Sequence, residues 1–170
     1  MAVRQVLHYP DPRLQTVARP VTEFDEQLAR LVEDLADTMY SEQGVGLAAT
    51  QIDVHQRVII VDISADRSAL QAFINPQIIW RSEQTLLFEE GCLSVPDVYD
   101  KVARPASIRV GAQDVHGQAF ELDAEGLLAQ CLQHEMDHLG GTVFVQYLSP
   151  LKRQRIVAKL GKRRRQLMAA

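Results

Sequence analysis

The sequence predicts an α+β fold in which small antiparallel sheets surround one central helix, with another helix at the C-terminal end. Short apolar runs separated by turn residues indicate the strands, and apolar residues at helical spacing before Gly140 indicate the central helix. After Pro150, apolar residues recur at helical spacing. With 170 residues and 46% hydrophobic content, the chain can bury a substantial core, and we expect residues 1–170 to form a single domain.

The elements are predicted in the following order. An extended arm with turns runs through Pro20, and Asp25 then caps a helix that continues to residue 40. Strands are predicted at 57–63, 73–75, 78–83 and 86–90, with Pro76 ending the second of them. A hairpin follows, with strands at 107–113 and 118–122.

The central helix is expected to start after Asp123, which can act as its N-cap, and to stop at Gly140. Leu127, Leu128 and Cys131 continue its apolar stripe, so we expect them on its inner face.

Residues 152–170 are expected to form a basic helical tail. This tail contains eight of the 18 basic residues and no acidic residue, so the rest of the chain has 10 basic against 22 acidic residues, a charge of −12. A basic end on an acidic body indicates an anionic partner, such as nucleic acid or a ribonucleoprotein. The alternative is a helix that is simply solvated.

The segment QHEMDH, residues 133–138, carries the strongest chemical signal. On a helix, His138 lies about 40° around the axis from His134, so both imidazoles can reach one metal ion while Glu135 stands beside it. This is the HExxH pattern, with two metal ligands, an open position for water and a carboxylate that can move a proton. The alternative is a pair of histidines packed on a buried helix face.

A catalytic site of this kind needs a third protein ligand. No Asp, Glu, His or Cys follows His138, and Phe144 stands where many metallopeptidases have a third histidine, so the ligand must lie upstream. Cys131 shares the stripe of the histidines but is about 10.5 Å from His138 along the axis, and is better explained as a core or pocket-wall thiol. We therefore expect Cys92, in a loop after a predicted strand, to be the third ligand.

The segment GVGLAATQ, residues 44–51, matches a dinucleotide-binding pattern, and Asp62 follows at the distance of a ribose-binding acid. A dinucleotide site needs a strand before the glycines and a helix after them, whereas here a helix precedes them and a strand follows closely. The small residues instead indicate close approach of another backbone. Gln51 then needs a polar partner, which is either a ligand or the protein backbone.

With GVGLAATQ, EGCLS and QHEMDH in this order, the chain resembles bacterial peptide deformylase over nearly its full length. The resemblance implies an enzyme that removes the formyl group from the N-terminal formylmethionine of nascent polypeptides and releases formate. It also implies that Cys92, His134 and His138 bind the metal and that Glu135 is the catalytic acid and base.

The same resemblance implies that Gln51 and the amide of Leu93 stabilise the developing oxyanion. We further predict that the substrate backbone lies as an added strand beside the glycines at positions 44, 46 and 91. An apolar pocket for the methionine is predicted from Val45, Leu127 and Cys131. The substrate-binding residues expected from the sequence are thus Val45, Gly46, Gly91, Leu127 and Cys131.

The resemblance implies iron(II) as the metal in the cell, while one thiolate and two imidazoles also suit zinc, nickel or cobalt. It also implies that the basic tail contacts the ribosome. No signal peptide and no run of 18 apolar residues is visible, so we expect no membrane partner. Both cysteines have roles that need free thiols, which suits the cytoplasm.

Two other functions compete with this interpretation. A metallopeptidase would share HExxH but would not need Cys92. A ribosome- or RNA-binding module could hold a structural metal, but structural sites usually have four protein ligands, and the sequence offers three and an additional carboxylate.

Overall fold

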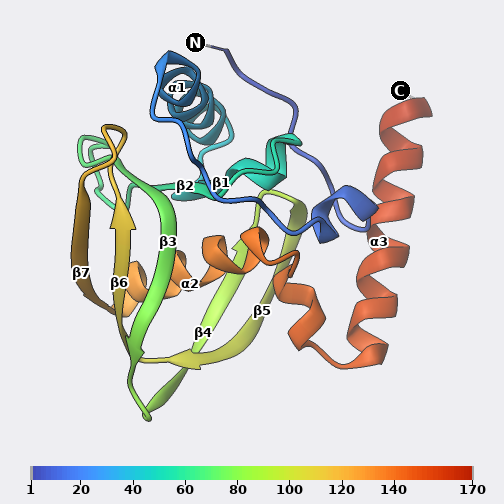
Figure 1. Ribbon diagram of the computed structural model, residues 1–170. Helices are drawn as coiled ribbons and strands as arrows, with labels where there is room; N and C mark the ends of the chain where they lie inside the picture. The colour runs from blue at the N-terminus through green and yellow to red at the C-terminus, as the bar shows by residue number, and fades with distance from the viewer. Residues whose placement is uncertain (1, 170) are drawn as a thin grey trace.

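Seven strands and three α-helices form the fold of the computed structural model, which describes residues 2–169 (Figure 1). The α-helices are α1 (Glu26–Ser41), α2 (Gly126–Leu139) and α3 (Pro150–Ala169). The strands are β1 (Gly46–Ala48), β2 (Val58–Val61), β3 (Gln71–Arg81), β4 (Thr85–Cys92), β5 (Val95–Pro105), β6 (Ser107–Gln113) and β7 (Ala119–Glu125). Short 3-10 helices occur at η1 (Pro12–Gln15), η2 (Ala49–Ile52) and η3 (Phe144–Tyr147).

The strands form two antiparallel sheets with α2 between them. The larger sheet has the order β1-β2-β3-β6-β7, and the smaller one is the β4-β5 hairpin. Helix α2 crosses the middle of the molecule, α1 packs on β1 and β2, and α3 stands at the outer side (Figure 1). The predicted α+β class, with small antiparallel sheets around a central helix and a C-terminal helix, is confirmed.

Three clusters of buried apolar residues hold these layers together. The first joins the larger sheet to α2 through Phe73, Val110 and Leu132. The second joins α3 to β5, and the third joins α1 to β1 and β2. Helix α2 therefore has apolar contacts on its sheet side, and its polar residues His134, Glu135 and His138 are also buried.

The start of α1 agrees with the sequence prediction. The carboxylate of Asp25 accepts a hydrogen bond from the N–H of Leu28 at 3.1 Å, as expected of an N-cap. Helix α2 begins differently. The prediction that Asp123 caps α2 is wrong, because Asp123 lies in β7 and pairs with Arg109, and Glu125 occupies the N-cap position.

The structure differs from the strand prediction in two places. The chain does not break at Pro76, since β3 runs through it. Asn75 has a left-handed φ of 53°, and the pairing with β6 shifts register between Ile74 and Gln77, so the bulge accommodates a residue without an N–H. Strand β5 was not predicted, because its buried residues do not alternate regularly.

The inner face of α2 is narrower than the sequence suggested. Cys131 is buried as expected, but Leu127 is 50% exposed, so the expectation that it lies on the inner face is wrong. Among residues 2–169, no helix has both the length and the apolar character that crossing a membrane requires.

Candidate metal centre

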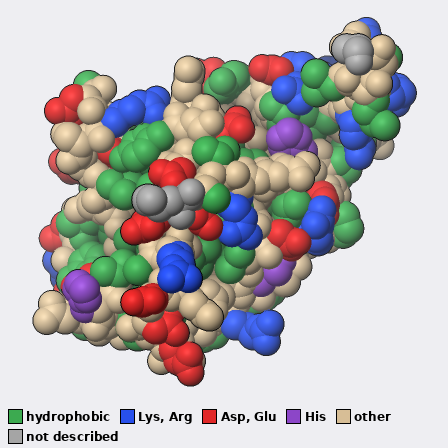
Figure 2. Space-filling view, turned by 90° about the horizontal axis from the view of Figure 1, so that it is seen from above, with side chains coloured by type: hydrophobic (Ala, Val, Ile, Leu, Met, Phe, Trp, Pro, Cys, Tyr) green, Lys and Arg blue, Asp and Glu red, His purple; other side chains and the backbone are tan. Residues whose placement is uncertain are grey.

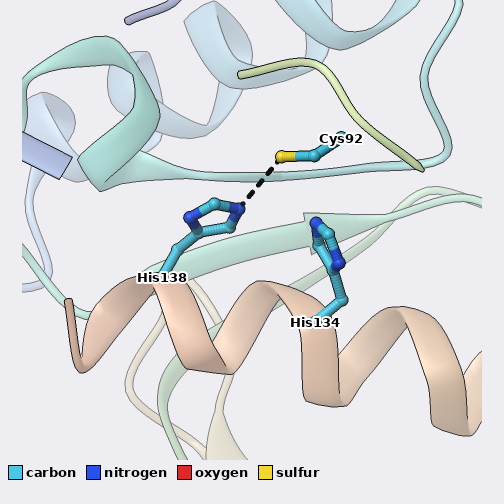
Figure 3. Close-up of side chains that lie close together, drawn as sticks. All are labelled: Cys92, His134 and His138. Atoms are coloured by element: carbon cyan, nitrogen blue, oxygen red, sulfur yellow. Dashed lines mark hydrogen bonds between the residues drawn. The ribbon is translucent and has the colours of Figure 1, made fainter. Parts of the chain in front are cut away.

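Helix α2 and the end of β4 bring three potential metal ligands together (Figure 3). His134 and His138 project from the same side of α2, with ring centroids 5.1 Å apart, and both are buried. Cys92 ends β4, and its Sγ lies 3.3 Å from Nε2 of His138. One ligand atom from each of the three residues lies within 4.8 Å of the others.

These distances and the chemistry of the donors fit a divalent transition metal. With metal bonds of ~2.3 Å to sulfur and ~2.0 Å to nitrogen, tetrahedral ligands lie roughly 3.3 to 3.6 Å apart. Nδ1 of His134 is 2.9 Å from a carboxylate oxygen of Glu90, which leaves Nε2 for the metal. Burial lowers the pKa of His138 well below its usual value, which favours the neutral ring that a ligand needs. Burial also opposes protonation of His134, but the nearby charges of Cys92 and Glu135 outweigh it and raise the pKa of His134 well above its usual value, so metal binding there would displace a proton.

Glu135 faces the same centre without being one of the three ligands. Its carboxylate is buried against the backbone of Gly46, where a Cβ would lie 2.6 Å from Oε2. Within residues 2–169, Oε1 of Glu135 has no hydrogen-bond partner. Burial raises the pKa of Glu135 to about 7, which suits a group that accepts and returns a proton near neutral pH.

Gln51 serves both the backbone and the site. Its Oε1 accepts a hydrogen bond from the N–H of Ala48 at 2.9 Å. Of the two partners predicted for Gln51, the oxygen therefore binds the protein backbone. Its Nε2 donates to Oγ of Ser94 at 3.0 Å and lies 3.5 Å from Sγ of Cys92. The NH2 group is thus held beside the metal ligands, where it can also donate to a bound oxygen.

A cavity of about 650 Å³ opens onto Cys92, His134 and Glu135, and we call it the active-site cavity. Five residues expected from the sequence to bind substrate or stabilise the oxyanion line it, namely Val45, Gly46, Gln51, Gly91 and Leu93. Leu127 and Cys131 are not in this lining. Cys131 packs in the first core cluster, and burial raises the pKa of its thiol to about 12.

The sequence reasoning missed a buried ionic network behind His134. Arg104 donates to both carboxylate oxygens of Glu90, and its Nη1 is 2.9 Å from Oδ2 of Asp137. The hydroxyl of Tyr147 donates to the same oxygen of Asp137 at 2.8 Å. Burial opposes ionisation of Glu90, but the hydrogen bonds from Arg104 and His134 outweigh it and hold its pKa below the usual value.

The sequence profile of the family described as polypeptide deformylase matches residues 3–154. The chain belongs to this deformylase family. It is 59% identical to peptide deformylase 1 of Burkholderia multivorans over 162 residues, which cover 95% of this chain and 90% of that protein.

Solved structures of deformylases have the same fold. The peptide deformylase of Legionella pneumophila superposes with a TM-score of 0.95 at 47% identity, covering 99% of each chain. That of Ehrlichia chaffeensis in complex with actinonin gives a TM-score of 0.91 at 38% identity, covering 96% of this chain and 98% of that one. The deformylase fold thus extends over nearly the whole chain, α3 included.

Proposed function

We propose that this deformylase-family chain is a metal-dependent amide hydrolase that removes the formyl group from the N-terminal formylmethionine of nascent polypeptides. The observation that carries the proposal is the convergence of Cys92, His134 and His138 beside Glu135, at a cavity open to substrate. The names of the relatives point to a formyl group rather than to another amide.

Cys92, His134 and His138 would hold one divalent ion, which would supply a water of lowered pKa, ~7 in favourable cases. Glu135 accepts the proton of the attacking water as the formyl carbon becomes tetrahedral. It then returns this proton to the departing amine, so formate and the free N-terminus are released. The raised pKa of Glu135 lets one carboxyl do both.

The remaining site residues have proposed roles in binding. Nε2 of Gln51 and the N–H of Leu93 would donate to the developing oxyanion, and losing one such donor costs roughly 10² to 10³ in rate. The substrate backbone would lie beside Gly46 and Gly91. Val45 lines the cavity and would contact the methionine side chain.

The further assignment of Leu127 and Cys131 to the methionine pocket stays a prediction. A Leu127→Ala variant tests it, because loss of the pocket wall should raise KM for formyl-Met more than for formyl-Ala.

Iron(II) is our proposal for the ion in the cell, with zinc, nickel or cobalt able to occupy the same thiolate and imidazole ligands. Metal analysis of protein prepared without oxygen, compared with an air-exposed sample, tests this. Loss of iron together with activity on exposure to air supports iron, whereas equal activity with zinc in both samples contradicts it.

The test of the activity itself is formate release from formyl-Met-Ala, with acetyl-Met-Ala as the control substrate. We expect Glu135→Gln to keep its metal and fold but to lose at least about 10²-fold in kcat. Unchanged turnover would remove Glu135 from the mechanism. Cleavage of the Met-Ala bond in place of formate release would indicate a metallopeptidase.

We also propose that α3 contacts the ribosome and that the protein works in the cytoplasm, where nascent chains emerge. Basic side chains gather at the projecting upper right of Figure 2. Lys162, Arg164 and Arg165 of α3 are exposed. Changing these three residues to Glu should weaken cosedimentation with ribosomes and flatten its salt dependence. The control reverses three exposed basic residues outside α3, namely Arg30, Arg67 and Arg81. Equal binding by both triple variants would contradict the proposal.

A further inference from the structure

The C-terminal helix is attached to the polypeptide segment that follows the metal-binding cysteine. Nζ of Lys159 donates to the backbone oxygen of Asp97 at 2.6 Å, and Nε of Arg163 lies 3.3 Å from its carboxylate. These two basic residues are four apart, so they lie on one face of α3. Their common partner, Asp97, belongs to β5, whose first residue follows the turn after Cys92.

Apolar packing fixes the same helix face. Ile156 and Leu160 of α3 are buried in the second core cluster together with Val95 and Val98 of β5. The side of α3 that carries Arg163 therefore has a defined position relative to the metal centre. This side of α3 is part of the folded core, not a freely solvated tail.

Because of this attachment, α3 contributes to the active-site cavity. Arg163 and Leu167 line the cavity that also contains Cys92, His134 and Glu135. Its volume of about 650 Å³ lies well within the range of roughly 300 to 1,000 Å³ typical of sites for whole organic ligands. The same cavity is lined at the metal centre by Cys92 and His134 and at α3 by Arg163 and Leu167, so an extended peptide whose formyl group lies at the metal centre can run towards α3.

We propose that Arg163 and Leu167 bind the substrate peptide beyond its first two residues, and this rests on the proposed deformylase activity. Arg163 uses Nε for Asp97 and has further N–H groups on its two Nη atoms, which can donate to a peptide carbonyl oxygen. Leu167 is 61% exposed beside it and offers an apolar contact to the neighbouring side chain.

The charges in the cavity favour a neutral acceptor over a carboxylate. Asp97 and Glu42 also line the cavity, and both would repel an anionic group of the substrate. His8 is another lining residue, and burial together with the charge of Arg163 lowers its pKa. It therefore adds no positive charge near neutral pH. A main-chain carbonyl oxygen meets Arg163 without this repulsion.

The experiment compares formyl-Met-Ala-NH2 with formyl-Met-Ala-Ser-Leu-NH2, both amidated so that no terminal carboxylate is present. The quantity measured is the ratio of kcat/KM for the longer to the shorter peptide, on metal-loaded full-length enzyme. We expect the ratio to exceed one in the unmodified protein. In Arg163→Ala and in Leu167→Ala it should fall about threefold to tenfold through KM, the loss expected for one hydrogen bond or a small apolar contact.

Arg155→Ala and Met168→Ala are the matched controls for Arg163→Ala and Leu167→Ala, because these exposed residues of α3 are not in the cavity lining. They should leave the ratio unchanged. A ratio near one in the unmodified protein, or an equal loss on both peptides in the Arg163 and Leu167 variants, would overturn the proposal. A longer peptide with Asp in place of Leu tests whether Arg163 binds a carbonyl oxygen or a carboxylate. A higher kcat/KM for the Asp peptide than for the Leu peptide would mean that Arg163 binds a carboxylate, which would contradict the proposed contact with a main-chain carbonyl. Failure of the unmodified protein to release formate from either peptide would instead refute the proposed function.

Discussion

Removal of Arg104 is predicted to be among the most destabilising single changes in this protein. Its side chain is 5% exposed and that of Glu90 is 1% exposed, so the charge of Glu90 is compensated inside the protein and not by water. An Arg104→Met variant keeps the apolar stem but removes the guanidinium. Glu90 would then retain Nδ1 of His134 as its remaining hydrogen-bond partner in the network.

The size of the effect follows from this burial. Removing one partner of a buried ion pair typically costs about 3 to 5 kcal/mol, because the other charge is left uncompensated. Since the contact of Glu90 with His134 remains, we expect Arg104→Met to lower the free energy of unfolding by about 3 kcal/mol, near the lower end of this range. For a chain of this length, this corresponds to a fall of roughly 6 to 12 °C in Tm.

The assay is denaturant unfolding at equal metal content, with a surface pair as the matched control. Arg109 pairs with Asp123, and these side chains are 49% and 72% exposed, so Arg109→Met should cost no more than about 1 kcal/mol. A Glu90→Gln/Arg104→Met double variant should recover part of the loss, because it no longer buries an unpaired charge. If Arg104→Met and Arg109→Met were equally stable, the buried network would not have the role assigned to it.

Three further outcomes are expected. Gly46→Ala should keep the metal but lower kcat at least about tenfold, because the added Cβ would displace the Glu135 carboxylate, 2.6 Å away. Ser94→Ala should lower kcat with little change in KM or metal content, because Nε2 of Gln51 loses the hydroxyl to which it donates at 3.0 Å. The control variant Ser94→Thr keeps a hydroxyl and should restore part of the rate. Protein with free metal at 100 times its Kd should have a free energy of unfolding about 2.7 kcal/mol larger than protein whose metal has been removed with a chelator. An unchanged Tm after removal of the metal would contradict a bound ion.

The grouping of Cys92, His134 and His138 could be predicted because its signals are local or follow from the absence of ligand residues after His138. His134, Glu135 and His138 lie within one helical turn and a half, where spacing determines the shared face. No Asp, Glu, His or Cys follows His138, so the third ligand was expected upstream, and of the two cysteines there the distance along the helix disfavoured Cys131. The structure brings the sulfur of Cys92 to these histidines, as this reasoning expected.

Strand β5 and the cap of α2 could not be predicted in the same way. The left-handed φ of 62° at Asp97 interrupts the alternation of β5, so no period of two is visible. Asp123 has the sequence character of a cap, but its pairing with Arg109 across β6 and β7 extends the strand past it. The position of Arg163 beside the cavity likewise depends on packing of α3 against β5, a contact between segments about 60 residues apart.

Glu90 was missed although the sequence contained its signal. Alternate residues of a strand face the same side, so Glu90 and Cys92 of β4 both point towards α2, while Gly91 between them is exposed. One strand thus supplies both the sulfur near His138 and the carboxylate that binds Nδ1 of His134. Because Arg104 joins Glu90 to Asp137 of α2, any shift of β4 along α2 would disturb both histidine contacts together. We therefore expect Glu90→Gln to weaken metal affinity about 10- to 100-fold although Glu90 is not a ligand, and unchanged affinity in that variant would show that His134 is oriented by packing alone.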